Sequence, residues 1–251
     1  MILAAVAVLA TGMTSCRSHY EVQGVSRARI LIDQRYDARP DAEAAAFLAP
    51  YTQRIDSVMT PVVGEVAEYM WAERPESNLS NLLADIMVWA GRAYGERPDV
   101  GVYNMGGIRA AVAKGPVTYG NVVDVAPFEN KICFLTLTGE NLLELFRQIA
   151  AVGGEGVSHG VRLVITKDGR LVSAELNGKP VDPAARYRVA TLDYLAQGND
   201  KLMAFRSGSD VVSPQESKNN TRYIIRDYFL WMKSQGKVVD SRVEGRISLS
   251  L

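Results

Sequence analysis

Histidine and cysteine are both scarce in this chain, which has two of each among its 251 residues. A metal centre with imidazole and carboxylate ligands needs several such side chains, and the chain offers only His19 and His159 as histidines. A Ser–His–Asp catalytic triad would have to use His159 with the neighbouring Ser158. Adjacent side chains generally diverge, and the nucleophile-elbow pattern is missing, so both observations speak against such a triad. We therefore expect no metal site and no catalytic residue in this chain, and we expect His159 to be a polar loop residue.

An excess of charge of either sign is also missing, because 28 basic and 28 acidic side chains cancel. Binding to a nucleic-acid polymer or to a membrane through a polybasic surface is therefore not expected. The apolar run from Met1 to Ser15 carries no charge and is too short to span a bilayer. Cys133 lies in a strand-like run, so we expect a buried thiol, without a disulfide partner if Cys16 is acylated.

The first 16 residues have the features of a secretory leader. The segment Met13-Thr-Ser-Cys16 resembles a bacterial lipobox, in which the cysteine is lipidated and becomes the new N-terminus. We expect residues 1–16 to be a lipoprotein-type signal segment, with Cys16 anchoring the protein in the bacterial cell envelope, facing the periplasm or the surface. The missing basic n-region is a departure, and an ordinary secretory leader with an incidental cysteine is the alternative.

Residues 17–40 have a mixed composition and are expected to form a tether, within which Arg29–Asp33 is a candidate strand. Residues 41–60 predict a linker helix, because acidic side chains stand in its first turn and helical spacing resumes after Pro50. Residues 61–251 are then long enough for one domain with its own core.

Helical and alternating patterns interleave in residues 61–251 without an internal repeat. We therefore predict an α/β (mixed α+β) domain with mixed sheets flanked by helices. The expected helices are Ser77–Tyr94, Thr138–Ala150 and Asn220–Met232, and the expected strands are Val161–Thr166, Leu171–Leu176, Tyr187–Leu192 and Arg242–Leu251.

The stretch from Asp99 to Arg109 is the most informative in the chain. A short apolar run that is typical of a buried strand ends in Asn104, a methionine, two glycines, an isoleucine and Arg109, which predicts a turn at the end of the strand. Gly106 and Gly107 allow a ligand to approach the backbone closely. Arg109 adds a planar, permanently charged donor suited to phosphate or carboxylate. A tight turn with a solvated arginine is the alternative.

Several further blocks follow in order and at plausible spacing, and together they closely resemble the C-terminal domain of 5'-nucleotidases. This family includes bacterial UDP-sugar hydrolases and ecto-5'-nucleotidase, and the resemblance runs from about residue 41 to the C-terminus. The blocks are Glu76–Asp85, Asn104–Arg109, Val125–Asn130, Leu137–Leu142 and Asp193–Asp200.

The resemblance implies a pocket for the nucleoside part of a substrate, in which two aromatic rings hold the base while asparagine, arginine and aspartate fix its edge and the ribose. Tyr194 would stack on the base, and the Asp200 carboxylate would accept hydrogen bonds from the ribose hydroxyls. Arg74 stands one position from a ligand-binding arginine of the family, and a surface arginine is the alternative. The implied substrate-binding residues are Arg74, Asn104, Gly106, Gly107, Arg109, Tyr194, Asn199 and Asp200.

The chain also departs from the family pattern. Met105, Asn199 and Lys201 stand where the family has glycine. In the loop Gly153–Gly160, Glu155 or a neighbour occupies the place that we assign to the first stacking phenylalanine, a loss of about 1–3 kcal/mol of stacking. Phe128 and Trp89 are expected to belong to the core.

In the family, a separate N-terminal metallophosphoesterase domain holds two metal ions. The roughly 40 residues before the predicted linker helix are too few to form such a domain. We therefore expect a nucleotide- or nucleoside-binding domain that acts in nucleotide hydrolysis with a separately encoded dimetal phosphoesterase. This chain would hold no cofactor, divalent metals would sit on the partner, and the chain would not be active alone. A binding or scaffold lipoprotein with a drifted pocket is one alternative, and an autonomous hydrolase is another.

Overall fold

The computed structural model describes residues 20–31, 33–38 and 41–250, so Cys16 and the leader lie outside the described residues. The chain divides between Ala49 and Pro50 into two compact units. In residues 20–31 and 33–38 of the first unit no strand forms, and the expected strand at Arg29–Asp33 is therefore wrong. The described backbone there is exposed and pairs with no other strand, while Arg35 folds back on the Asp33 carboxylate at 2.7 Å.

Helix α2 (Ala42–Met59) corresponds to the predicted linker helix and runs through Pro50 without interruption. The Asp41 carboxylate accepts hydrogen bonds from the amides of Glu43 and Ala44, which satisfies donors that a helix start leaves free. No residue of α2 is buried. Among the described residues, no helix combines the length and the apolar character needed to cross a membrane.

The second unit, which begins at Pro50, contains a five-stranded mixed sheet with the order β10-β4-β9-β2-β5. Strands β2 and β9 run parallel, and the other neighbours are antiparallel. The bounds are Val100–Tyr103 for β2, Ile132–Thr138 for β4, Gly156–Val157 for β5, Arg186–Leu192 for β9 and Ser209–Val212 for β10.

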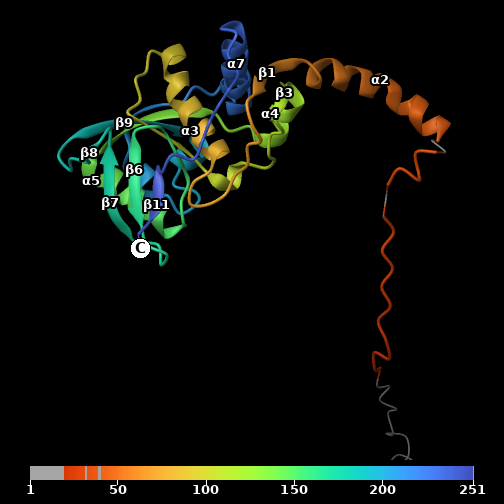
Figure 1. Ribbon diagram of the computed structural model, residues 1–251, viewed down its shortest axis with the longest axis horizontal. Coiled ribbons are helices and arrows are strands. Elements are labelled where there is room, and N and C mark those ends of the chain that lie inside the picture. Colours follow the sequence, from red (N-terminus) through yellow and green to blue (C-terminus); the bar gives the residue numbers. More distant parts are fainter. Residues whose placement is uncertain (1–19, 32, 39–40, 251) are drawn as a thin grey trace, which may run out of the picture. The chain divides into compact units, whose positions relative to one another are not determined.

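A four-stranded sheet has the order β11-β6-β7-β8, and Figure 1 shows β11, β6 and β7 side by side. The turn between β7 and β8 uses Asn177 and Gly178 with φ of 52° and 73°, the two positive values that a tight hairpin requires. The bounds are Val161–Ile165 for β6, Leu171–Leu176 for β7, Lys179–Pro180 for β8 and Ile247–Leu249 for β11; β1 (Val62–Val66) pairs separately with β3 (Gly115–Thr118).

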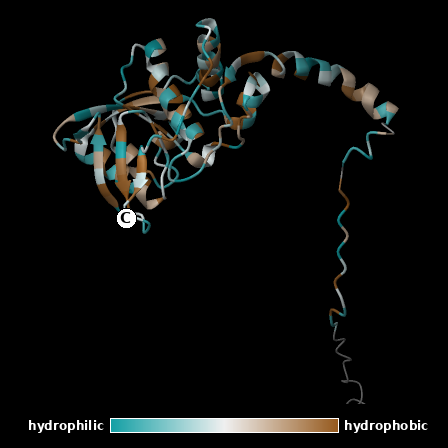
Figure 2. Ribbon diagram, in the orientation of Figure 1, coloured by the Kyte–Doolittle hydropathy of each residue, from teal (hydrophilic) through white to brown (hydrophobic). Residues whose placement is uncertain are grey.

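Helix α3 packs on β2, β5 and β9, and α5 packs on β4, β7 and β9. Helix α3 begins at a reciprocal cap in which Ser77 and Ser80 bond each other's backbone. In Figure 2, which has the orientation of Figure 1, hydrophobic colour is prominent along β6, whereas α2 carries mixed colours. The helices are α3 (Asn78–Ala90), α4 (Tyr119–Val125), α5 (Gly139–Ala151), α6 (Asp193–Ala196) and α7 (Thr221–Ser234), and the 3₁₀ turns are η1 (Gly91–Tyr94), η2 (Met105–Gly107), η3 (Met203–Ser207) and η4 (Ser217–Asn219).

The mixed α/β architecture and the predicted helices are confirmed, and Cys133 is buried as expected. The predicted closing strand is too long, since only Ile247–Leu249 pairs, in parallel with β6. The residues before it are engaged in side-chain contacts instead of a ladder.

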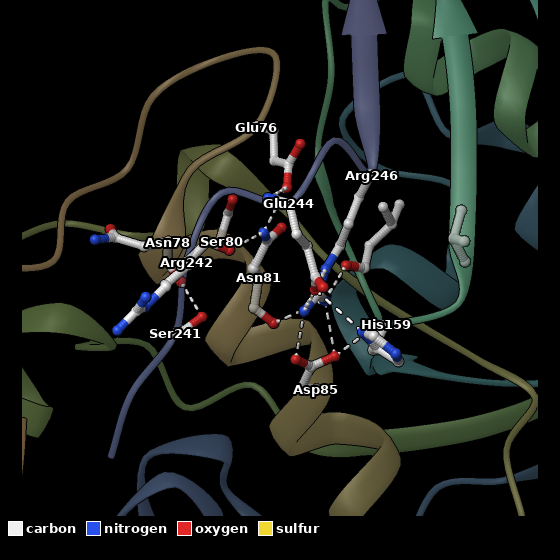
Figure 3. Close-up of polar contacts among 12 residues, drawn as sticks. Glu76, Asn78, Ser80, Asn81, Asp85, His159, Ser241, Arg242, Glu244 and Arg246 are labelled. Atoms are coloured by element: carbon white, nitrogen blue, oxygen red, sulfur yellow. Dashed lines mark hydrogen bonds and ion pairs between the residues drawn. The ribbon is translucent and has the colours of Figure 1, made fainter. Parts of the chain in front are cut away.

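Arg246, which is 3% exposed, is the centre of those contacts (Figure 3). Its guanidinium donates to both oxygens of Asp85 on α3 at 2.8 and 2.7 Å, to Glu244 at 2.7 Å and to the Val157 carbonyl of β5 at 2.8 Å. The exposed ring of His159 meets Glu244 at 3.2 Å, which agrees with the expected polar loop residue. One buried cation therefore joins α3, the end of β5 and the C-terminal strand.

Replacing Arg246 by methionine should lower the free energy of unfolding by about 3–5 kcal/mol, because it leaves partly buried carboxylates without their cation. Urea unfolding followed by circular dichroism measures the loss. Arg170→Met is the control, since the Arg170–Asp168 pair is largely exposed and should contribute little. Equal stability of the two variants would contradict the central role of Arg246.

Candidate functional site

The turn predicted after the apolar run is confirmed: β2 ends at Tyr103, and η2 follows Asn104 directly. The Gly107 amide donates to the Asn104 carbonyl at 3.1 Å. A Cβ on Gly107 would lie 2.6 Å from Asn104 Oδ1, so a side chain at this position would displace the Asn104 amide. Gly106 is exposed, and a Cβ on it would lie 3.8 Å from an Asp200 oxygen. The absence of a side chain on Gly106 keeps the space beside Asp200 open.

A second loop follows β9 and begins with α6. Because β2 and β9 are parallel neighbours, the loops that leave their carboxyl ends meet at the same edge of the sheet. Asn104 Nδ2 donates to Asp200 Oδ2 at 2.5 Å, and the Tyr194 hydroxyl donates to Asp200 Oδ1 at 2.9 Å. The bond to Asp200 raises the pKa of Tyr194, which keeps its hydroxyl protonated as a donor. Asn199 Nδ2 donates a hydrogen bond to the Tyr194 carbonyl at 2.7 Å.

These two loops enclose a pocket of about 200 Å³. The structure thus brings together five of the residues that the sequence singled out, while Asn199 braces the loop behind Tyr194. Two further lining residues come from the segment after α4. The lining residues are Asn104, Gly106, Gly107, Phe128, Asn130, Tyr194 and Asp200.

Phe128 was expected in the core, and that expectation is wrong: its side chain is 45% exposed and forms a wall of the pocket. The pocket therefore has two aromatic lining residues, Phe128 and Tyr194. Asn130 was not predicted, although both residues stand in the block Val125–Asn130, where a polar loop follows a proline. Trp89 does pack against the core, as expected.

Arg109 stands beside the pocket without lining it. Its side chain is exposed, its Nη1 donates to the Gly106 carbonyl at 3.3 Å, and its guanidinium carbon lies 5.9 Å from the centre of the Phe128 ring. These contacts leave much of the charged group free to meet an anion at the rim.

Glu155 does not occupy a stacking position, because its side chain is 2% exposed and turned inward. One oxygen lies 2.5 Å from Arg74 Nη2, and the other accepts a hydrogen bond from the Met105 amide. Burial raises the pKa of Glu155, and the Met105 amide and Arg74 oppose that rise. Arg74 also donates to the Gly154 carbonyl at 2.8 Å, and it lines a separate cavity of about 490 Å³ beside the end of α5. Arg74 is thus not a wall of the smaller pocket.

The pocket combines flat aromatic surfaces with amide groups and one carboxylate. The aromatic surfaces suit a flat polar ring, and the carboxylate suits hydroxyl groups attached to the same molecule. In residues 20–31, 33–38 and 41–250, no group of three or more His, Cys, Asp or Glu side chains is placed to hold a metal ion. The fold and site define a mixed α/β domain with a pocket at the ends of two parallel strands.

The family model "5'-nucleotidase, C-terminal domain" matches residues 52–207, more than half of the chain. The chain therefore belongs to the 5'-nucleotidase C-terminal domain family.

Solved and curated relatives agree with this assignment. A 5'-nucleotidase precursor from Thermus thermophilus superposes with a TM-score of 0.71 at 30% identity, over 85% of this chain and 44% of that protein. Protein UshA of Escherichia coli (strain K12) is 27% identical over 62% of this chain and 29% of its own length. Endonuclease YhcR of Bacillus subtilis (strain 168) is 27% identical over 89% of this chain and 18% of its own length. The chain thus spans less than half the length of each of these relatives.

The loop that carries Asp200 contains consecutive left-handed residues, with φ of 54° at Asp200 and 66° at Lys201. Lys201→Gly should stabilise the protein by about 0.5–1 kcal/mol, because glycine adopts this backbone without the steric cost of a Cβ. Thermal unfolding measures the change. Gly178→Ala, at a φ of 73° with open space around it, should act in the opposite direction. A destabilised Lys201→Gly variant would show that the lysine side chain outweighs the backbone cost.

Proposed function

We propose that this domain binds the nucleoside part of a nucleotide or nucleoside in the pocket between Phe128 and Tyr194. The observation that carries the proposal is the Asp200 carboxylate, which two donors orient beside the two aromatic rings. Stacking of a base on such rings contributes about 1–3 kcal/mol each and tolerates different bases. The ribose hydroxyls would donate to the lone pairs of Asp200 that Asn104 and Tyr194 leave unused.

The charge distribution around the pocket supports a ligand with a small negative charge. Arg109 is the cation at the rim, whereas Arg74 is engaged by the buried Glu155. A phosphate on the bound nucleoside would meet Arg109, whose planar donor group suits phosphate oxygens. A nucleoside or a nucleoside monophosphate therefore fits better than a more highly charged ligand.

We further propose that the domain serves nucleotide hydrolysis together with a separately encoded dimetal phosphoesterase, with the protein held at the bacterial cell envelope through a lipidated Cys16. The Thermus thermophilus relative is named a 5'-nucleotidase precursor, and this chain covers 44% of it. The sequence has only two histidines, so the metal chemistry is assigned to the partner. The binding domain would supply recognition and the partner would supply the activated water.

Calorimetric titration of the full-length chain in detergent micelles with adenosine and AMP tests the pocket. Tyr194→Ala should weaken both ligands about 10-fold or more, since it removes one stacking face. Tyr194→Phe keeps the ring but removes one of the two donors to Asp200, so its affinity should lie between those of Tyr194→Ala and the unaltered chain. Arg109→Ala should weaken AMP and leave adenosine nearly unchanged.

Tyr69→Ala is the matched control, because Tyr69 is an aromatic residue that is 55% exposed outside the pocket. It should bind like the unaltered chain. No saturable binding at millimolar adenosine or AMP would contradict the nucleoside pocket and favour a scaffold lipoprotein.

The partnership needs a separate test. Co-purification from the native envelope should recover a metallophosphoesterase, and mixing the two should accelerate phosphate release from AMP in a way that Tyr194→Ala abolishes. Metal-stimulated release by this chain alone, surviving stringent purification, would show an autonomous hydrolase instead.

A further inference from the structure

We propose that Glu155 and Arg74 are positioning residues: the buried Glu155 carboxylate, clamped by Arg74, holds the Met105 amide and thereby fixes Asn104 against Asp200. Neither residue lines the pocket, so both would act on it through the backbone of η2. The inference rests on the proposed function, because it concerns how the nucleoside pocket is kept in its binding geometry.

Both oxygens of Glu155 are engaged, and they face different parts of the chain. Oε1 lies 2.5 Å from Arg74 Nη2, and Oε2 accepts from the Met105 amide. Arg74 is itself held at a second point, since its Nε donates to the Gly154 carbonyl at 2.8 Å. The guanidinium is thus fixed at Gly154 and Glu155, and the carboxylate transmits that position to η2.

From Met105 the contacts continue into the pocket. Its neighbour Asn104 donates to Asp200 Oδ2 at 2.5 Å, and Asp200 Oδ1 accepts from the Tyr194 hydroxyl at 2.9 Å. A shift of the Met105 amide would therefore move Asn104 and release one of the two donors that orient Asp200. Charged side chains keep such geometry only while their partners stay in place.

The charge state of Glu155 should control this arrangement. The groups that face it are Arg74, the Met105 amide and, on the opposite loop, Asp200, whose negative charge opposes ionisation of Glu155. Burial is the largest cause of the raised pKa of Glu155. Glu155 therefore takes up its proton at a higher pH in the folded protein than in the unfolded chain.

The affinity for the ligand and the contribution of Glu155 to stability should then change in opposite directions with pH. Because the folded pKa lies above the unfolded one, the contribution of Glu155 to stability is fully present below the unfolded value and is lost as the pH rises through the folded value. Protonation also removes the charge that binds Arg74 and the Met105 amide. Acidification through this window should therefore weaken ligand binding while this group makes the fold more stable. A residue that served stability alone would not make affinity fall while stability rises.

The test is adenosine titration of the full-length chain from pH 7.5 down towards about 4.5, the ordinary value for glutamate. Glu155→Gln should weaken adenosine about 10-fold at pH 7.5, and its affinity should depend less on pH than that of the unaltered chain. The two affinities should converge at the acid end. Asp200 is present in both proteins, so the difference between their profiles isolates Glu155.

Arg74→Gln gives the second profile. It leaves the buried Glu155 charge without its cation, so Glu155 should take up its proton at a higher pH and the acid loss of affinity should begin earlier. Glu216→Gln is the matched control, because the Glu216–Lys218 pair is 70% and 73% exposed and makes no contact with Glu155 or Arg74. It should follow the unaltered chain throughout.

The outcomes separate this inference from the proposed function. If the unaltered chain binds adenosine and Glu155→Gln binds it equally with the same pH profile, the inference is overturned and the nucleoside pocket stands. If the unaltered chain binds no adenosine, the proposed function fails and the inference fails with it. If Glu155→Gln does not fold, the pH profile of Arg74→Gln decides. Loss of affinity that begins at a higher pH than in the unaltered chain supports the inference, and an unchanged profile overturns it.

Discussion

The second unit depends on a buried cation, because Arg246 ties the segment before β11 to α3 and to the end of β5. It contacts α3 through Asp85, β5 through the Val157 carbonyl, and the approach to β11 through Glu244 (Figure 3). Taking a guanidinium out of water is costly unless carboxylates and carbonyls surround it, and here they do. Val157 lies two residues from Glu155, so the contacts of Arg246 also set the strand from which the carboxylate reaches η2.

The pocket follows from strand direction more than from any single motif. Strands β2 and β9 are parallel neighbours, so Asn104 and Asp200, far apart in the sequence, leave the sheet at one edge. Phe128 approaches from the segment after α4. Each loop supplies only part of a binding surface, and the sheet brings the parts together.

Periodicity predicted the helices well, because the apolar residues of α3, α5 and α7 recur at helical spacing and are buried against sheets or other elements. The prediction that Phe128 lies in the core was wrong, since nothing in the sequence around this aromatic residue separates a buried ring from a pocket wall. The contact between Arg74 and Glu155 could not be predicted from the sequence either. The two are 81 positions apart, and only the fold shows that the arginine meets a carboxylate and not the pocket. At Arg29–Asp33 the apolar residues predicted a strand, but a strand needs a neighbour and the described residues there have none.

Helix α2, which buries no side chain, has a different kind of stability from the rest. With 18 residues it exceeds only modestly the roughly 12–15 at which isolated helices become marginal in water. Its backbone amides should exchange hydrogen with solvent through local fraying, on the timescale of a helix–coil equilibrium. The amides of α3, covered by the core, should wait for global unfolding. One polypeptide would thus carry a slow-exchanging domain and a faster-exchanging helix, with Met59 at the end of the helix packed against the core.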